Sequence, residues 1–367
     1  MSEENPTPEP DPQRPKLPHE IGHRQKTLAG EPAVVVVQQP PGLFRRMVGW
    51  LGWLGFGLCL MVIVGLYSSS QDYFDTTGGI QEKYHSLSKT SRTKIAVIDI
   101  SGIIIEGNGF VKRQIDRIRE DANVKAVVLR INSPGGTITG SDYLYHHLVQ
   151  LRKDRELPMV VSMGSMAASG GYYIAMAVGD QEGSIYAEPT TTTGSIGVII
   201  PHYDITGLME ELHIKDDSIA THPRKQMLSM TRSLTDDDRQ ILEQYIGYAF
   251  DRFKDIVKTG RPQFAEDSEA LDKLATGEIF TAVQATKSGL VDEIGFVEAA
   301  IDRAIELASL EKNNVRVVTF KKPATLLGAI GFGAAHTPSL GLAQLLELSS
   351  PRAYYLATSL PALVSSN

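Results

Sequence analysis

Hydrophobic and polar positions divide the chain into a polar leader, one long apolar run, an alternating middle region and an apolar end. The apolar run Met47–Tyr67 contains 21 residues without a charge. At about 1.5 Å per residue, such a helix spans the roughly 30 Å hydrocarbon core of a bilayer. Arg45 and Arg46 precede the run, and Asp72 is the first charge after it. The positive-inside rule therefore predicts that residues 1–46 stay in the cytoplasm and that the rest is exported.

Two other interpretations of the apolar run are a cleaved signal peptide and a buried core helix. The leader is longer than an ordinary positively charged n-region, and Leu66–Ser70 offers no clear A-x-A cleavage site. We therefore expect an uncleaved transmembrane signal anchor over residues 47–68, followed by a linker over residues 69–93.

Beyond the linker, apolar runs of strand length alternate with amphipathic segments. Strands are predicted over Lys94–Ile105, Ala126–Ile131, Pro158–Met163 and Gly194–Ile200. Helices are predicted over Val111–Asp121, over Ser141–Arg155 and from Ala167 onward. Strands and helices in alternation indicate an α/β fold with right-handed βαβ units and a mostly parallel sheet. In such a sheet, active-site residues are expected in the loops at the carboxyl ends of the strands.

Composition narrows the class of protein. The hydrophobic fraction of 42% is typical of a globular protein. The net charge of −7 argues against nucleic-acid binding. The single cysteine, Cys59, cannot form an intramolecular disulfide or a zinc cluster. Nine of the 19 prolines fall within the first 41 residues, so the leader 1–46 is predicted to be disordered. The apolar tail 323–367 carries two charges, and we expect it to pack on a neighbouring subunit or the membrane rather than cover the site.

Two loops are candidates for chemistry. The loop Asn132–Gly136 follows a predicted strand, and its paired glycines allow two backbone N–H groups to face one point, as an oxyanion hole requires. The loop Ala167–Tyr173 surrounds Ser169 with small residues at a predicted strand-to-helix turn, which makes Ser169 a candidate nucleophile. Taken alone, each loop has an ordinary alternative, a Pro-Gly turn for the first and a helix-capping serine for the second.

A serine nucleophile needs a base, which is a histidine or a neutral lysine. His202, His213 and His222 are possible members of a triad, but no flanking motif distinguishes them. A free lysine has a pKa near 10.4, and lowering it to roughly 7 to 8 by desolvation requires about 3 to 4.5 kcal/mol. A lysine base predicts activity that rises from neutral toward alkaline pH.

Three extended motifs resemble the signal peptide peptidase A family, the S49 serine peptidases. They are INSPGGTITG (Ile131–Gly140), SMGSMAASGGYYIA (Ser162–Ala175) and TTTTGSIGVI (Thr190–Ile199), and the likeness covers roughly Lys94–Ala308. The resemblance implies a ClpP/crotonase-type spiral fold, with a single peptidase domain over residues 94–322 behind one transmembrane helix. Longer members carry two repeats, whereas this chain has one copy of each motif.

The resemblance also implies roles for five residues. The serine before Gly-Gly-Tyr is the nucleophile, the base is a later lysine, a further serine orients that lysine, and two backbone N–H groups form the oxyanion hole; here these are Ser169, Lys225, Ser195, and Gly136 with Gly170. Before Lys225, His222 and Pro223 replace the family's small-residue turn, which leaves Lys215 as the alternative base. Lys215 lies beside Asp216 and Asp217, which would hold it charged.

Together, these points predict a membrane-anchored serine endopeptidase with a Ser/Lys dyad. We expect a homo-oligomeric ring in the cytoplasmic membrane with catalytic domains outside the cytoplasm, in which Ser169 of one subunit meets Lys225 of its neighbour. The expected substrates are remnant signal peptides or other short apolar peptides. We expect the pocket for the residue before the cleaved bond to be apolar and to suit Ala or Leu. No metal, organic cofactor or nucleic acid is implied. One rival interpretation is a catalytically silent membrane scaffold of the same fold. The other is an acyl-CoA-binding crotonase-like enzyme, but the predicted export of the domain argues against it because acyl-CoA is cytoplasmic.

Overall fold

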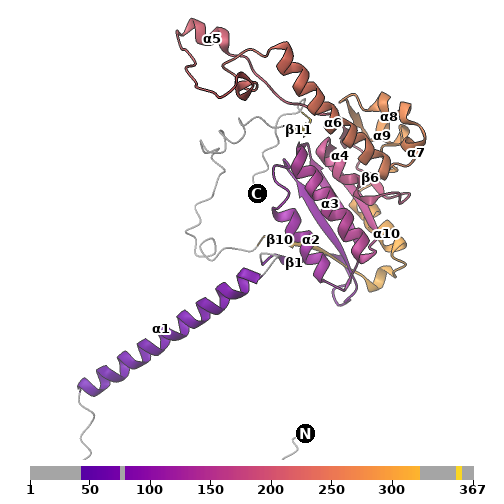
Figure 1. The fold of residues 1–367 in the computed structure, drawn as a ribbon. Coiled ribbons are helices and arrows are strands. Elements are labelled where there is room, and N and C mark those ends of the chain that lie inside the picture. The colour runs from indigo at the N-terminus through magenta and orange to yellow at the C-terminus, as the bar shows by residue number, and fades with distance from the viewer. Residues whose placement is uncertain (1–42, 75–78, 323–352, 358–367) are drawn as a thin grey trace, which may run out of the picture. The chain divides into compact units, whose positions relative to one another are not determined.

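The computed structural model describes residues 43–74, 79–322 and 353–357 (Figure 1). The predictions for the leader 1–42 and for tail residues 323–352 and 358–367 lie outside the described residues. Contacts divide the chain into two units, Met1–Leu66 and Tyr67–Asn367. The helices of the second unit are α2 (Phe110–Glu120), α3 (Ile138–Arg155), α4 (Gly170–Ala175), α5 (Thr206–Glu211), α6 (Asp236–Gly260), α7 (Gln263–Glu266), α8 (Ser268–Leu274), α9 (Ala282–Lys287) and α10 (Val297–Leu307).

Helix α1 (Leu43–Phe74) contains the predicted membrane span. Its segment Gly49–Tyr67 has a mean hydropathy of 2.0, and none of this window is buried within the structure. The large apolar side chains of the segment are exposed, including Trp50 and Trp53 at 75% each. A helix this long and apolar on every side is suited by length and composition to cross a membrane.

The sheet is mostly parallel, as the alternation of strands and helices predicts. Its strands run in the order β1-β10-β2-β3-β5-β6-β9, and β7 continues alongside β5 and pairs with β8. Only the pairs β1–β10 and β7–β8 are antiparallel within the described sheet. The strands are β1 (Gln81–Leu87), β2 (Lys94–Ser101), β3 (Val124–Ser133), β5 (Met159–Ala168), β6 (Ile185–Ala187), β7 (Thr192–Gly194), β8 (Ile279–Thr281), β9 (Glu293–Ile294) and β10 (Arg316–Lys321).

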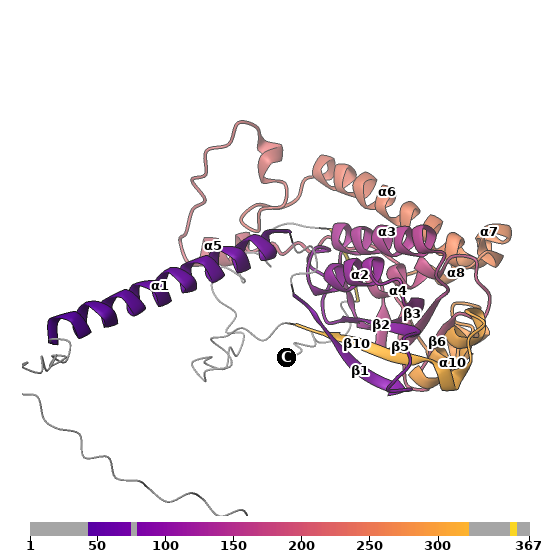
Figure 2. The ribbon, with the colours of Figure 1, turned by 90° about the horizontal axis from the view of Figure 1, so that it is seen from below.

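Both faces of the central strands are buried, which explains their uninterrupted apolar sequences. Along β2, Ala96 and Ile98 join a core with side chains of α2, α3 and α4, whereas Ile95 and Val97 pack with α10. The same alternation continues along β3. Figure 2 shows α2 and α3 on one side of the sheet and α10 on the other. The result is a three-layer α/β arrangement whose strand ends carry the candidate site.

Several predicted boundaries are wrong. Strand β2 ends at Ser101 rather than Ile105, and β5 continues to Ala168 because β7 pairs with Met166–Ala168. Helix α4 consequently begins at Gly170 and not at Ala167. The predicted strand Gly194–Ile200 is also wrong, since β7 ends at Gly194 and only Ile199 of the following segment forms a bridge.

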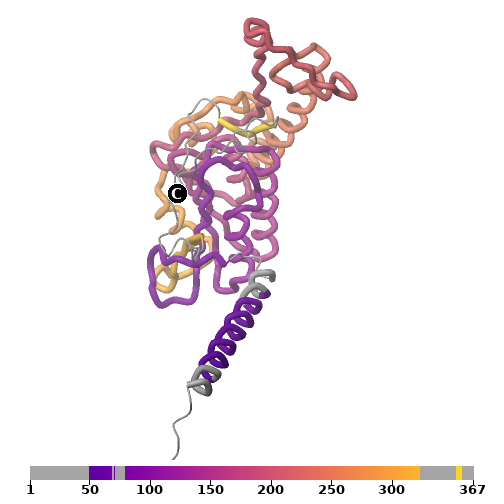
Figure 3. Tube along the Cα trace, turned by 90° about the vertical axis from the view of Figure 1, so that its left-hand side faces the viewer, coloured from indigo at the N-terminus to yellow at the C-terminus, as the bar shows by residue number. Residues whose placement is uncertain are grey.

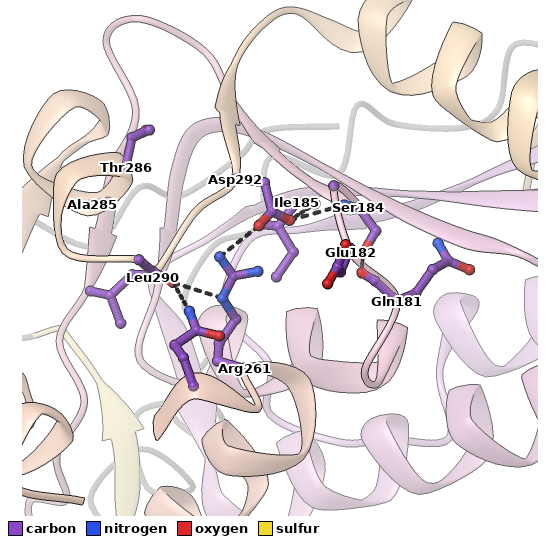
Figure 4. Close-up of polar contacts among 12 residues, drawn as sticks. Gln181, Glu182, Ser184, Ile185, Arg261, Ala285, Thr286, Leu290 and Asp292 are labelled. Atoms are coloured by element: carbon purple, nitrogen blue, oxygen red, sulfur yellow. Dashed lines mark hydrogen bonds and ion pairs between the residues drawn. The ribbon is translucent and has the colours of Figure 1, made fainter. Parts of the chain in front are cut away.

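An ion pair between buried Arg261 and partly buried Asp292 fixes the end of α6 to the sheet (Figure 4). The Arg261 guanidinium lies 2.8 Å from an Asp292 carboxylate oxygen, and its Nε donates to the Gly289 carbonyl at 2.7 Å. The other oxygen of Asp292 accepts from the backbone N–H groups of Ser184 and Ile185 at 2.9 Å each. Arg261 is only 5% exposed, so its positive charge needs partners within the protein. The Asp292 carboxylate and the Gly289 carbonyl are these partners.

A segment over residues 200–232, here called the arm, joins the sheet region to α6 (Figures 1 and 3). It contains α5 and a 3₁₀ turn, Pro223–Gln226, and the rest has no helix or strand. Asp204 closes its base by accepting hydrogen bonds from Ser233 and Thr206, which lower the pKa of this carboxyl to about 2. The arm also exposes large apolar side chains: Tyr203, Leu208, Leu212, Ile214 and Ile219.

Candidate active site

Ser169 lies at the sharp turn between β5 and α4. Its backbone has φ 53° and ψ −117°, a left-handed conformation that is strained for a residue with a side chain. The residue is 1% exposed, and its side chain makes no capping hydrogen bond to α4. The turn is held by the Ser169 N–H, which donates to the Gly194 carbonyl at 2.7 Å. A strained turn without a capping bond favours a reactive role over the ordinary helix-capping role.

The glycine loop lies directly against this turn. Residues Gly135–Thr137 form the short strand β4, and Gly135 has φ 97°. A Cβ added to Gly170 would lie 3.2 Å from the Gly136 nitrogen, so the two predicted oxyanion-hole residues are neighbours in space. Ser133 holds the loop, since its Oγ accepts from the Gly135 N–H and donates to the Gly102 carbonyl at 2.6 Å. Two peptide N–H groups can therefore face one oxygen atom here.

Ser195 lies one residue beyond the carbonyl that binds the Ser169 backbone. It is 7% exposed and has φ 52°, and its N–H donates to the Glu278 carbonyl at 2.6 Å. The neighbouring Thr193 hydroxyl donates to the Ala167 carbonyl at 2.6 Å and locks β7 to the end of β5. The structure thus brings Ser169, Ser195, Gly136 and Gly170 to one edge of the sheet.

A short strand from the distant end of the sequence occupies this edge. Strand β11 (Tyr354–Leu356) pairs antiparallel with β4, with Tyr355 opposite Gly136. On its other side, Tyr354 exchanges two backbone hydrogen bonds with Ile199, at 2.8 and 3.0 Å. For residues 353–357, the structure shows the alternative that we did not favour, in which the tail covers the site. An extended peptide is thus bound along both of its edges.

Two hollows lie beside this strand. One has a volume of about 730 Å³ and lies beside Ala353 and the start of α3. The other, about 560 Å³, lies beside Leu356 and includes Ser195 and Phe250. The peptide groove is defined here as the space between β4 and Ile199 that holds residues 353–357.

The structure does not bring Lys225 to Ser169. Lys225 is exposed in the 3₁₀ turn of the arm, and the hollow beside it is lined by residues 218–221, 225–226 and 228–230 of the arm itself. His222 accepts a hydrogen bond from the Arg224 N–H through Nδ1 and so begins this turn. Any meeting of Lys225 with a serine requires a second copy of the chain or a movement of the arm.

The alternative bases lie on the arm as well. Lys215 is exposed next to Asp216, whose pKa is lowered by hydrogen bonds from Ser218 and Thr231. A charged carboxylate at this position argues against Lys215 as a neutral base. His202 is the one candidate histidine that is partly buried, and its Nε2 lies 3.1 Å from the Ser229 carbonyl. Among the described residues, no three His, Cys, Asp or Glu side chains are grouped to hold a metal.

Sequence reasoning missed an aromatic pocket at the site. Tyr355 is fully buried between Tyr173 and Phe253, with ring centroids 5.1 and 4.7 Å away. Tyr173 is in turn fixed by Asp142, which accepts its hydroxyl at 2.6 Å and also binds Arg252. In the sequence, the only sign of this pocket is the group of large side chains at Tyr354–Leu356 in the apolar tail. The sequence does not show that this group pairs with β4.

Comparison with known proteins identifies the family. The model of peptidase family S49 matches residues 151–311. A putative signal peptide peptidase SppA from Enterococcus faecium is 33% identical over 247 residues, which are 64% of this chain and 69% of that protein. A putative protease from Synechocystis sp. is 34% identical over 264 residues, covering 71% of this chain and 92% of the relative. The chain belongs to peptidase family S49. Its mostly parallel α/β fold is consistent with the ClpP/crotonase-like fold expected from its motifs.

Other S49 relatives are longer. Protease 4 from Salmonella typhi is 35% identical over 226 residues, which are 59% of this chain but only 35% of that protein. This chain therefore aligns with about a third of the length of Protease 4. The names of these S49 relatives support a protease activity for this chain, and together with the apolar helix α1 they support association with a membrane.

Proposed function

We propose that this S49 chain is a membrane-anchored serine endopeptidase that uses Ser169 as nucleophile and Lys225 as general base. The observation that carries the proposal is the peptide segment 353–357, bound along both edges beside the strained Ser169 turn and the Gly135–Gly136 loop. Binding through backbone hydrogen bonds is what an enzyme needs to hold an extended peptide substrate.

In the proposed reaction, the Ser169 hydroxyl attacks the scissile carbonyl while its proton passes to the neutral lysine amine. The N–H groups of Gly136 and Gly170 stabilise the negative oxygen that forms. The ammonium then gives its proton to the leaving amine, which departs and leaves an ester on Ser169. Water attacks this ester with the lysine again acting as base, which releases the acid product and restores the hydroxyl. Ser195, next to the Ser169 turn, is suited to orient the lysine by hydrogen bonding.

The lysine comes from a neighbouring subunit in this proposal. Lys225 lies on the arm, whose exposed apolar side chains, including Leu212 and the fully exposed Ile219, have no cover within the described chain. Large exposed apolar patches mark association surfaces. A second copy that received the arm would cover these side chains and bring Lys225 into an apolar setting beside Ser169. Head-to-tail contacts of this kind give a ring when the rotation between neighbouring copies closes, and a closed ring is part of this proposal.

The proposed substrates are apolar peptides at the membrane, such as signal peptides left after preprotein processing. Support comes from the apolar helix α1 and from the relative named as a putative signal peptide peptidase. In this proposal the peptidase unit lies outside the cytoplasm, which the positive charges of Arg45 and Arg46 before the apolar segment support.

Complementation tests the shared site. We would co-express full-length Ser169→Ala and Lys225→Ala chains, purify the mixed oligomer in detergent and measure hydrolysis of a fluorogenic peptide. Each variant alone is expected to be inactive. The mixture should recover about a quarter of the wild-type rate, because random assembly gives one site in four an intact serine and an intact lysine.

The outcomes separate the alternatives. An inactive mixture together with an active wild type would place both groups of each site in one chain, or would assign the base to another residue. An active Lys225→Ala chain would exclude Lys225 as the base and would direct attention to Lys215 or His222. A wild-type chain that assembles but cleaves no peptide would favour the scaffold interpretation.

A further inference from the structure

Exposed basic side chains gather where the sheet of the second unit begins. Strand β1 starts at Gln81 and pairs antiparallel with β10, and Gln81 lies opposite Lys321 (Figure 2). Lys83, Lys321 and Lys322 are all exposed at this end of the two strands. The Lys322 Nζ lies 5.6 Å from the centroid of the Phe110 ring at the start of α2. The ends of the two strands and the start of α2 therefore meet.

Helix α2 adds a fourth basic side chain. Arg113 lies one turn after Phe110 on the same helical face, and it is also exposed. We call Lys83, Arg113, Lys321 and Lys322 the basic tip. Among the described residues, none of these four side chains forms an ion pair, whereas Lys112 of the same helix is paired with Asp116 at 2.6 Å.

The lysines of the basic tip repel one another. Lys83 and Lys321 are diagonal neighbours on one face of the β1–β10 pair, with Cα atoms about 7–8 Å apart. Like charges at such a distance are unfavourable. The side chain of Glu82 points to the other face, where Lys94 binds its carboxylate at 2.6 Å. An anion bound at the basic tip would remove this repulsion.

The covalent chain limits the distance between the basic tip and the end of the proposed membrane span. The apolar segment ends at Tyr67, and α1 continues to Phe74. From Phe74 to Gln81, where β1 begins, an extended chain reaches at most about 25 Å. With about 10 Å for the last turns of α1, the start of β1 stays within roughly 35 Å of the end of the span. Lipid headgroups at that boundary are therefore within reach of the basic tip.

The basic tip lies at the same edge of the sheet as the candidate active site. Strand β10 runs parallel to β2, β2 runs parallel to β3, and β3 runs parallel to β5. The carboxyl ends of β10 and β5 are thus at one edge of the sheet, and Ser169 follows directly on β5. A surface that binds the basic tip therefore lies on the side of the sheet that carries Ser169.

We propose that the basic tip binds the headgroups of anionic phospholipids at the membrane surface. Arg113 suits a phosphate because its guanidinium donates two parallel hydrogen bonds, and the lysines act as point charges. The whole chain carries a net charge of −7, so the attraction is local and acts over the screening length of about 8 Å. The contact holds the sheet edge with Ser169 toward the bilayer, where apolar peptides emerge. Only this last consequence rests on the proposed peptidase function.

Fluorescence quenching in vesicles tests the contact. The full-length chain carries Cys59→Ser and Tyr84→Cys, and a fluorophore is attached at position 84, which is exposed on β1 beside the basic tip. The vesicles contain a phosphatidylcholine with a nitroxide on its headgroup, with or without about one third of phosphatidylglycerol. Both leaflets have the same composition, so the direction of insertion does not affect the result. Quenching should be stronger with phosphatidylglycerol and should weaken as the NaCl concentration rises.

Two double variants of equal charge test the basic tip itself. Lys321→Gln with Lys322→Gln should lower the ratio of quenched to unquenched chains about thirtyfold in phosphatidylglycerol vesicles, because each basic residue near an anionic surface contributes a factor of about five. Lys273→Gln with Lys287→Gln is the matched control, with the same loss of charge at exposed positions on α8 and α9. Helix α9 packs beside β7 and β9, which are distant from β1 in the strand order. The control should be quenched as strongly as the wild type.

Several results would overturn the lipid contact. Equal quenching in the two kinds of vesicle, or an equal loss in the control variant, would exclude a specific contact with anionic lipid. A loss on adding inorganic phosphate that exceeds the loss in NaCl of the same ionic strength would assign the basic tip to a small soluble anion. A phosphatidylglycerol effect that appears only at many chains per vesicle would assign it to a second copy of the chain.

Peptide hydrolysis separates failure of this inference from failure of the proposed function. In phosphatidylglycerol vesicles, the chain with Lys321→Gln and Lys322→Gln should cleave a soluble peptide at the wild-type kcat/KM and a membrane-bound apolar peptide more slowly. Lipid-dependent quenching in a chain that cleaves no peptide would keep the lipid contact and reject the peptidase function. Cleavage without lipid-dependent quenching would reject the contact and leave the peptidase function standing.

Discussion

Glycines at the candidate site are required by contacts that leave no room for a side chain. A Cβ on Gly136 would lie 1.8 Å from the Ile104 carbonyl oxygen, and one on Gly170 would lie 2.4 Å from Ser141 Oγ. The Ile104 oxygen also accepts from the Thr137 N–H at 2.8 Å, so it cannot move without breaking the loop. The backbone can approach a peptide carbonyl here only because these residues have no side chain.

Gly136→Ala is therefore expected to displace the loop. The collision with backbone should cost about 1–3 kcal/mol of stability, and movement of the N–H should lower kcat roughly a hundredfold or more. Gly109→Ala is the control, because a Cβ at Gly109 would have no neighbour within 4 Å. Thermal unfolding and peptide hydrolysis measure the two effects. Full activity of Gly136→Ala would show that this loop does not bind the reacting oxygen.

At the scale of helices and strands, the central layer could be predicted and the chain reversals at the site could not. The runs around Ala126–Ile131 and Pro158–Met163 form strands because both faces are buried, which leaves a continuous apolar signal. Around Ala167 the residues are small and have no strong preference, so pairing with β7 decides that the strand continues to Ala168. The conformation of Ser169 follows from that tertiary contact.

Short strands whose pairing partners are distant in the sequence could not be predicted either. Strand β11 has three residues, and its partner β4 lies more than 200 positions away. Nothing local distinguishes Tyr355 from other aromatic residues in an apolar tail. The motif residues Ser169, Gly136, Gly170 and Ser195, by contrast, lie together in the structure as their positions after neighbouring strands suggest. Their catalytic roles stay predictions.

The ion pair between Arg261 and Asp292 supports the element that carries the aromatic pocket. Asp292→Asn leaves the guanidinium of Arg261, which is 6% exposed at its side chain, without a charged partner. We expect a loss of about 3 kcal/mol, measured by denaturant unfolding of the full-length chain in detergent. Asp302→Asn provides the same change in the exposed pair with Lys312 and should cost less than about 1 kcal/mol. Equal losses would show that burial does not decide the strength of the pair.

For the whole molecule, our proposal divides the active site between two copies of the chain, with the groove on one copy and the arm on the other. The unit Tyr67–Asn367 contains the proposed nucleophile Ser169, the proposed oxyanion loop and the segment that binds residues 353–357, while its arm presents Lys225 away from them. An isolated copy would then hold peptides without cleaving them efficiently. Activity should therefore depend on assembly, which the complementation experiment measures directly.

The pH profile of the assembled enzyme tests which kind of base it uses. A lysine acts as base only when neutral, so kcat/KM should rise from pH 7 toward roughly pH 9, whereas an ordinary histidine base would reach its plateau near pH 7.5. The phenols at the site do not contribute to this rise, because burial raises the pKa of Tyr173 and of Tyr355 above the ordinary value and keeps both protonated. The Tyr173→Phe variant is the control, and its profile should rise over the same range as that of the wild type. A flat profile above pH 7.5 in the wild type would contradict a lysine base and favour His222 or His202.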